Sequence, residues 1–152
     1  MRRSTTFFTA TMLTLGLTTA GFAGVATAAD QLTQKEFLKA GNTICKTANK
    51  EINAIFEPIF AGLGKNERPS PEAITTATAG AVPIFRDALS EIEALKGPAS
   101  LEKKVAKVLD QYTAAVDGFE ADPQAAFSET GTNPFAKPNK TARKVGLKVC
   151  AQ

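Results

Sequence analysis

The two cysteines of this chain, Cys45 and Cys150, constrain its fold more than any other sequence feature. Their even number favours a single disulfide, provided that the chain reaches an oxidising compartment. Such a bond would close a loop of roughly 105 residues, for which the chain-entropy account gives about 4–5 kcal/mol of stabilisation before strain. Two free, buried thiols are the alternative. A disulfide would bring the first and last parts of the folded domain together.

The first 28 residues have the three parts of a secretory signal peptide. Arg2 and Arg3 form a short basic region, apolar and small residues follow over 7–25, and Ala-Thr-Ala at 26–28 fits a cleavage site. A membrane anchor is the competing interpretation, but the stretch is rich in Thr, Gly and Ala and no basic cluster follows it. We therefore predict a secreted or envelope-associated protein, exported by the general secretory route rather than the twin-arginine route, without a transmembrane segment after cleavage.

The remaining residues, 29–152, are predicted to form a single helical domain. They are enough for one hydrophobic core and too few for two. The whole chain carries a formal net charge of +3, but two of its arginines belong to the signal, so the domain itself is close to neutral. A general attraction to nucleic acid is therefore not expected.

A long amphipathic helix is predicted over 33–60, with Cys45 near its middle. Thr33 and Glu36 have the spacing of a capping box, in which each side chain accepts a bond from the other residue's backbone N–H. Apolar residues recur every three or four positions and, at about 100° per residue, fall on the same side as Cys45. Pro58 is expected to kink or end this helix because it lacks a backbone N–H.

A second helix is predicted to start at Ser70, because serine followed by proline is a favoured N-cap and first position. Pro83 lies inside its apolar pattern and predicts a bend, and Gly97-Pro98 marks its end. The third helix, from near Ser100 to Phe119, has the clearest amphipathic pattern in the chain.

Asp122-Pro123 predicts a short helical turn through Phe127, and a final helix is expected to end near Val145, before Gly146. We find no convincing alternation typical of strands and no internal repeat. The sequence therefore predicts an all-α fold, a four-helix bundle of antiparallel, kinked helices closed by one disulfide.

Catalytic chemistry is sparse in this sequence. The chain has no histidine, which removes the commonest general base and metal ligand, and a disulfide would remove both thiols. Two pairs of carboxylates, Asp87 with Glu91 and Asp117 with Glu120, lie on polar helix faces, where solvated charge explains them better than acid–base catalysis. We predict that the protein is not an enzyme and that it uses no cofactor and no metal.

A basic patch near the C-terminus is one candidate site. The segment 137–148 contains five cations and no acid, which suits an anionic lipid, a cell-wall polymer or an acidic partner. A solvated helix face, whose cations favour the helix C-terminus, is the plainer explanation. The residues of the patch are Lys137, Lys140, Arg143, Lys144 and Lys148.

An apolar ligand site between the helices is the second candidate. Phe56, Phe60 and Phe85 lie near the two prolines and could line a pocket for a lipid-like or haem-like molecule. Ordinary core packing explains these phenylalanines at least as well. Tyr112, the only tyrosine, is expected to be a core residue whose hydroxyl reaches the surface.

The two ends of the domain resemble a known group of proteins. FLKAGNTIC at 37–45 and NPFAKPNKTARKVGLKVC at 133–150 resemble the beginning and end of small secreted or lipid-anchored actinobacterial proteins, which are largely uncharacterised. The resemblance implies a helical, disulfide-tied, exported domain and no particular activity. This chain lacks the acylated cysteine of the lipoprotein members, which favours release over anchoring.

These observations lead to two functional expectations. The first is a secreted, non-enzymatic helical domain that binds a cell-envelope or extracellular component. The second is a carrier of a small apolar ligand held between the helices. Nothing in the sequence identifies the partner or the oligomeric state.

Overall fold

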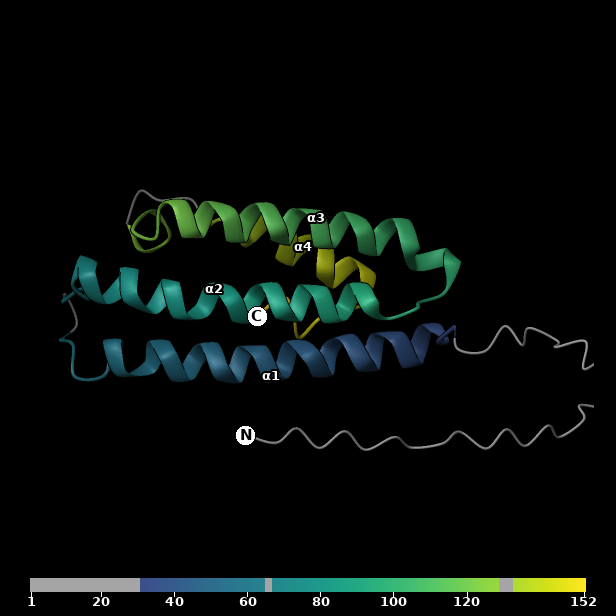
Figure 1. The fold of residues 1–152 in the computed structure, drawn as a ribbon, viewed down its shortest axis with the longest axis horizontal. Helices are drawn as coiled ribbons and strands as arrows, with labels where there is room; N and C mark the ends of the chain where they lie inside the picture. The colour runs from purple at the N-terminus through teal and green to yellow at the C-terminus, as the bar shows by residue number, and fades with distance from the viewer. Residues whose placement is uncertain (1–30, 65–66, 129–132) are drawn as a thin grey trace, which may run out of the picture.

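The computed structural model describes residues 31–64, 67–128 and 133–152 (Figure 1). Within these ranges the chain forms α1 (Gln34–Phe60), α2 (Pro71–Ala94), α3 (Ala99–Ala121) and α4 (Ala136–Val145), with a short 3-10 helix, η1 (Ala125–Phe127). No strand occurs in the described part. The predicted all-α class is confirmed, and the predicted signal peptide lies outside the described residues.

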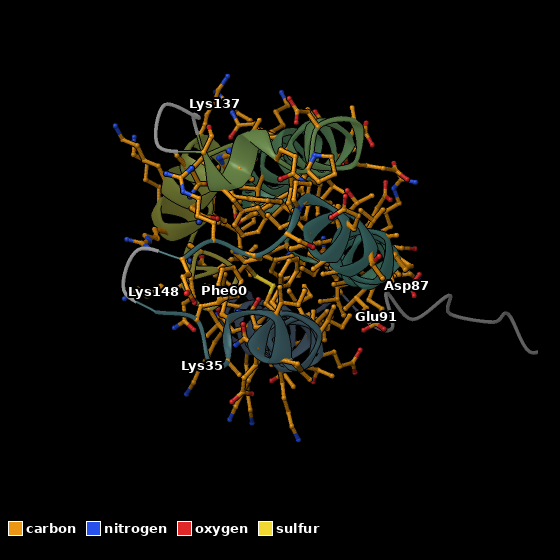
Figure 2. All side chains as sticks on the ribbon, turned by 90° about the vertical axis from the view of Figure 1, so that its left-hand side faces the viewer. Lys35, Phe60, Asp87, Glu91, Lys137 and Lys148 are labelled. Atoms are coloured by element: carbon orange, nitrogen blue, oxygen red, sulfur yellow. A yellow bond between two sulfur atoms is a disulfide. The ribbon has the colours of Figure 1, made fainter. Side chains whose placement is uncertain are left out.

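The four helices form a bundle in which each packs against the next in the chain, α1 on α2, α2 on α3 and α3 on α4. Figure 1 shows the three long helices side by side, with α4 behind α3. Seen end-on in Figure 2, α1, α2, α3 and α4 surround a common interior. Among the described residues, no helix is both long and apolar enough to span a bilayer.

Local sequence signals explain where the helices start. Thr33 Oγ1 accepts a bond from the Glu36 N–H at 3.3 Å, and Glu36 Oε2 accepts one from the Thr33 N–H at 3.0 Å, so the predicted capping box is present. The side-chain bond from Thr33 holds the pKa of Glu36 below its usual value. Ser70 Oγ accepts from the Ala73 N–H at 3.2 Å, as expected for the predicted cap.

The two internal prolines have different consequences. α1 ends at Phe60, within one turn of Pro58, whereas α2 continues past Pro83 to Ala94. A proline removes one helical hydrogen bond, so a helix continues beyond it only where packing compensates. In α2 the neighbours Ala81 and Val82 are buried at 0% and 4% exposure, which supplies that packing.

The main core gathers residues from all four helices and from the last residues of the chain. α4 closes at Gly146, which has a φ of 104° that glycine adopts without steric cost, and Leu147 then turns inward. The Leu147 N–H donates to the Ala142 carbonyl at 3.0 Å, and its side chain is 0% exposed. The buried members of the core are Phe37, Cys45, Ile92, Leu101, Val105, Val108, Tyr112, Ala142, Val145, Leu147 and Ala151.

Candidate functional site

The predicted disulfide is present and seats the C-terminal segment, residues 146–152, on α1. Cys45 and Cys150 are bonded across 105 positions of sequence. Gly41, one helical turn before Cys45, makes this close approach possible, because a Cβ at position 41 would lie 2.7 Å from Leu147 Cδ2. The bond therefore joins the first and last parts of the domain, as predicted.

Two asparagines of α1 hold the backbone of the same segment. Asn42 Oδ1 accepts from the Val149 N–H at 2.8 Å, and Asn49 Nδ2 donates to the Val149 carbonyl at 3.0 Å. Asn42 Nδ2 also donates to the Gly146 carbonyl at 3.1 Å. Seven positions apart, the two asparagines share one side of the helix, which was the sequence signal that could have revealed them. We call the following set the cystine site: Asn42, Asn49, Cys45, Cys150 and Tyr112.

Tyr112 lies in the core as predicted, and its hydroxyl forms hydrogen bonds within the fold. The residue is 6% exposed, and its hydroxyl oxygen lies 2.6 Å from the Cys150 carbonyl oxygen and 2.7 Å from the Asn139 side-chain amide. The hydroxyl has a single proton, and the Cys150 carbonyl and Asn139 Oδ1 are both placed to accept it. Burial raises the pKa of Tyr112 well above its usual range.

A small, partly open pocket lies beside the disulfide. Its volume is about 40 Å³, and its lining is almost wholly apolar, with Ala48, Phe85, Ile92, Val108 and Leu147 among its residues. Sites for drug-sized ligands typically enclose several hundred Å³. A haem-sized or lipid-sized molecule would therefore require this part of the bundle to open.

The three predicted ligand-binding phenylalanines pack against other phenylalanine rings and not against one another. Phe56 lies 6.4 Å from Phe119 and 5.8 Å from Phe127 between ring centroids, and Phe60 lies 5.9 Å from Phe127. Phe85 stacks on a further ring, Phe135, at 5.2 Å. Phe85 borders the pocket, whereas Phe56 and Phe60 do not. We call this set the ring cluster: Phe56, Phe60, Phe85, Phe119, Phe127 and Phe135.

The predicted basic residues divide into two kinds. Arg143 is exposed, yet its guanidinium donates through Nε and Nη2 to the Ala151 carbonyl, so it also holds the chain end. The lysines are exposed, and no carboxylate of the described residues forms an ion pair with them. On α4 they lie opposite the buried Pro138, Ala142 and Val145. These four are Lys137, Lys140, Lys144 and Lys148.

Lysines of α1 extend this basic surface. Lys35, Lys39 and Lys46 are exposed and, at about 100° per residue, lie within about 80° of Asn42 and Asn49 around the helix axis. The two asparagines mark the side of α1 that carries the C-terminal segment. In Figure 2, Lys137 and Lys148 project on one side of the bundle, and Asp87 and Glu91 on the other. We call the following set the lysine face: Lys35, Lys39, Lys46, Lys137, Lys140, Lys144 and Lys148.

The carboxylate pairs lie on the surface, as predicted. Asp87 and Glu91 are exposed on α2, and Asp117 and Glu120 both accept bonds from Arg86. Within the described ranges, no group of His, Cys, Asp or Glu residues is arranged to hold a metal ion. All four carboxylates of these pairs therefore lie on exposed helix faces.

Comparison of the sequence with protein-family models, with curated proteins and with solved structures finds no match. The resemblance to small actinobacterial exported proteins stays a prediction.

Proposed function

We propose that this protein is an exported, non-enzymatic domain that binds a phosphate-bearing, anionic component of the cell envelope through the lysine face. The observation that carries the proposal is the set of exposed lysines on α4 and the C-terminal segment, which have no carboxylate partner among the described residues. Unpaired lysines gathered on one side of a nearly neutral domain attract phosphate groups over several ångströms.

The scaffold beneath these lysines supports the proposal. The C-terminal segment is held to α1 by the disulfide and by Asn42 and Asn49, so Lys148 is presented on a fixed backbone beside α4. Fixing the positions of charges before binding lowers the entropy lost when a partner binds. The disulfide also suits export to an oxidising compartment.

The test uses two phosphate-bearing probes, vesicles containing phosphatidylglycerol and soluble poly(glycerol phosphate), with phosphatidylcholine vesicles as the neutral reference. Binding of at least one anionic probe is expected, and it should weaken as salt is raised because screening shortens the reach of the charges. The variant K137Q/K140Q/K144Q is expected to bind several-fold more weakly. A variant with the same charge change on other exposed lysines, K96Q/K103Q/K107Q, is the control and is expected to bind normally.

Three results would contradict the proposal. One is failure to bind either anionic probe. Another is an equal loss of binding in the control variant, which would show that net charge and not the position of the lysines determines binding. The third is a hydrolytic activity that a single carboxylate substitution abolishes. The carrier function stays a prediction, and a ligand that co-purifies with the native protein in mass spectrometry would favour it.

A further inference from the structure

A groove runs along the junction of α2 and α3, apart from the lysine face. It consists of two adjoining depressions of about 300 Å³ and 240 Å³. Glu93, Leu109 and Asp110 line both depressions, so the two depressions adjoin along the junction of α2 and α3. We call it the α2–α3 groove.

The floor of this groove is apolar. Leu89, Leu95 and Leu109 are only half-buried and pack on the main core, so part of each side chain still faces solvent. Below them lie the buried Ile92 and Val105. A partner with apolar side chains would remove this leucine surface from water, which is favourable at roughly 25 cal/mol per Å².

The rim of the groove is acidic. Glu93, Glu102 and Asp110 line it and are exposed, and no ion pair engages them among the described residues. The only cation in the lining is Arg86. A neutral apolar partner would leave these carboxylates partly desolvated without compensation, so the rim favours a cationic one.

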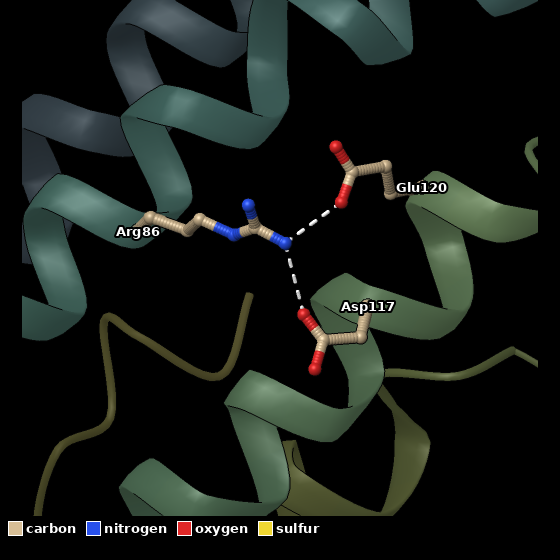
Figure 3. A network of polar contacts seen from close by, with 3 residues as sticks. All are labelled: Arg86, Asp117 and Glu120. Atoms are coloured by element: carbon tan, nitrogen blue, oxygen red, sulfur yellow. Dashed lines mark hydrogen bonds and ion pairs between the residues drawn. The ribbon is translucent and has the colours of Figure 1, made fainter.

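Arg86 is already occupied, and it marks one end of the groove. It extends from α2 to α3, where its Nη2 lies 3.0 Å from Asp117 Oδ1 and 2.7 Å from Glu120 Oε2 (Figure 3). The three side chains are more than half exposed, so this bridge adds little stability. Its effect is to neutralise the one positive charge that would repel a cationic partner.

We propose that the α2–α3 groove binds a basic amphipathic helix of a partner protein. The lining extends along α3 from Leu101 to Val116, about 22 Å at 1.5 Å per residue, which matches a partner helix of roughly four turns. Its apolar residues would cover Leu89, Leu95 and Leu109, and its lysines or arginines would face the acidic rim. This proposal does not depend on the lysine face.

The experiment measures binding of a labelled synthetic peptide with leucines along one side of a helix and lysines along the other. A peptide of the same composition in scrambled order is the reference. The intact protein is expected to bind the amphipathic peptide and to bind the scrambled one at least tenfold more weakly. The variant E93K/E102K/D110K should weaken binding by about tenfold or more because three rim charges change sign. Leu109→Asn should weaken it several-fold, with helix content checked by circular dichroism.

The matched control reverses three carboxylates at the junction of α1 and α2, Glu51 of α1 and Asp87 and Glu91 of α2, in E51K/D87K/E91K. Those residues line a separate depression of about 150 Å³ between α1 and α2, and the net charge change is the same. Normal binding by this control supports the groove. An equal loss of binding in the control, or equal binding of the scrambled peptide, would overturn the proposal, as would Leu109→Asn binding unchanged.

Discussion

At the cystine site, a disulfide and hydrogen bonds with Asn42, Asn49 and Tyr112 hold the backbone of the C-terminal segment. The ring cluster differs, because it consists of apolar side chains whose ring centroids lie 5.2–6.5 Å apart. Directed bonds specify which atoms meet, and apolar contact specifies only that rings meet. We therefore expect substitutions in the ring cluster to lower stability according to the buried side-chain volume that they remove. Substitutions at the cystine site should lower stability when they remove a particular bonded atom.

The largest effect is expected at the centre of the ring cluster. Phe119 is 4% exposed and contacts four other rings, so Phe119→Ala should lower the free energy of unfolding by about 3–5 kcal/mol. Phe60 is the matched control, because it belongs to the same cluster but is 44% exposed, and Phe60→Ala should cost about 1 kcal/mol or less. Urea unfolding measures both free energies. Equal losses of stability would show that burial does not determine how much each ring contributes.

Removing the disulfide should have the next largest effect. The double variant C45A/C150A is expected to lose about 2–5 kcal/mol, the usual range for a native disulfide in a small secreted domain. Hydrogen exchange should show lower protection over 136–152 than over the part of α1 that carries Phe56. An unchanged unfolding midpoint would show that the disulfide does not stabilise the fold, and an even loss of protection throughout the chain would show that it does not act locally on the C-terminal segment.

Two glycines offer a sharper test of close packing. Gly41→Ala should destabilise the protein by about 1–3 kcal/mol, because the new Cβ would lie 2.7 Å from Leu147 Cδ2. Gly118, in α3, has no atom within 4 Å of such a Cβ, so Gly118→Ala should stabilise the helix by up to about 1 kcal/mol. Thermal unfolding compares the two variants. A Gly41→Ala variant as stable as the wild type, or more stable, would show that the C-terminal segment does not pack closely against α1.

The smallest effect is expected from one hydroxyl. Tyr112→Phe removes the bond to the Cys150 carbonyl and should cost about 0.5–1.5 kcal/mol near neutral pH. The raised pKa of Tyr112 means that the folded state retains the phenolic proton at pH values where the unfolded chain loses it. This contribution is complete below the unfolded pKa of about 10 and is lost as the pH rises beyond it.

The absorbance of phenolate reports this titration without interference, since Tyr112 is the only tyrosine and the chain has no tryptophan. In the wild-type protein, phenolate should appear together with the loss of helical circular dichroism at alkaline pH. Ionisation of Tyr112 while the helices remain intact would show that its hydroxyl is accessible.

The sequence predicted those parts of the fold that depend on neighbouring residues. The caps at Thr33 and Ser70 and the helix end at Gly146 are local arrangements, so each was visible within a few residues. The disulfide was the exception among distant contacts, because only two cysteines were available to pair. By contrast, nothing near Tyr112 in the chain indicated that its hydroxyl would bond to Cys150.

The candidate surfaces were predictable only in part. The basic segment 137–148 was evident from composition, but the division between Arg143, which binds the Ala151 carbonyl, and the exposed lysines depends on how the chain end folds back. The α2–α3 groove was not predicted, because a groove exists only once two helices have packed at a particular depth and rotation.

By itself, then, the sequence determined the helices, their ends, the single covalent link and the absence of histidine chemistry, because each follows from local propensity or from residue count. The tertiary structure alone decided which rings meet, how the C-terminal segment lies on α1 and where a groove remains between α2 and α3. These features depend on contacts between residues far apart in the chain. The geometry of such contacts follows from the shapes of the two surfaces that pack together, and not from the sequence pattern of either helix alone.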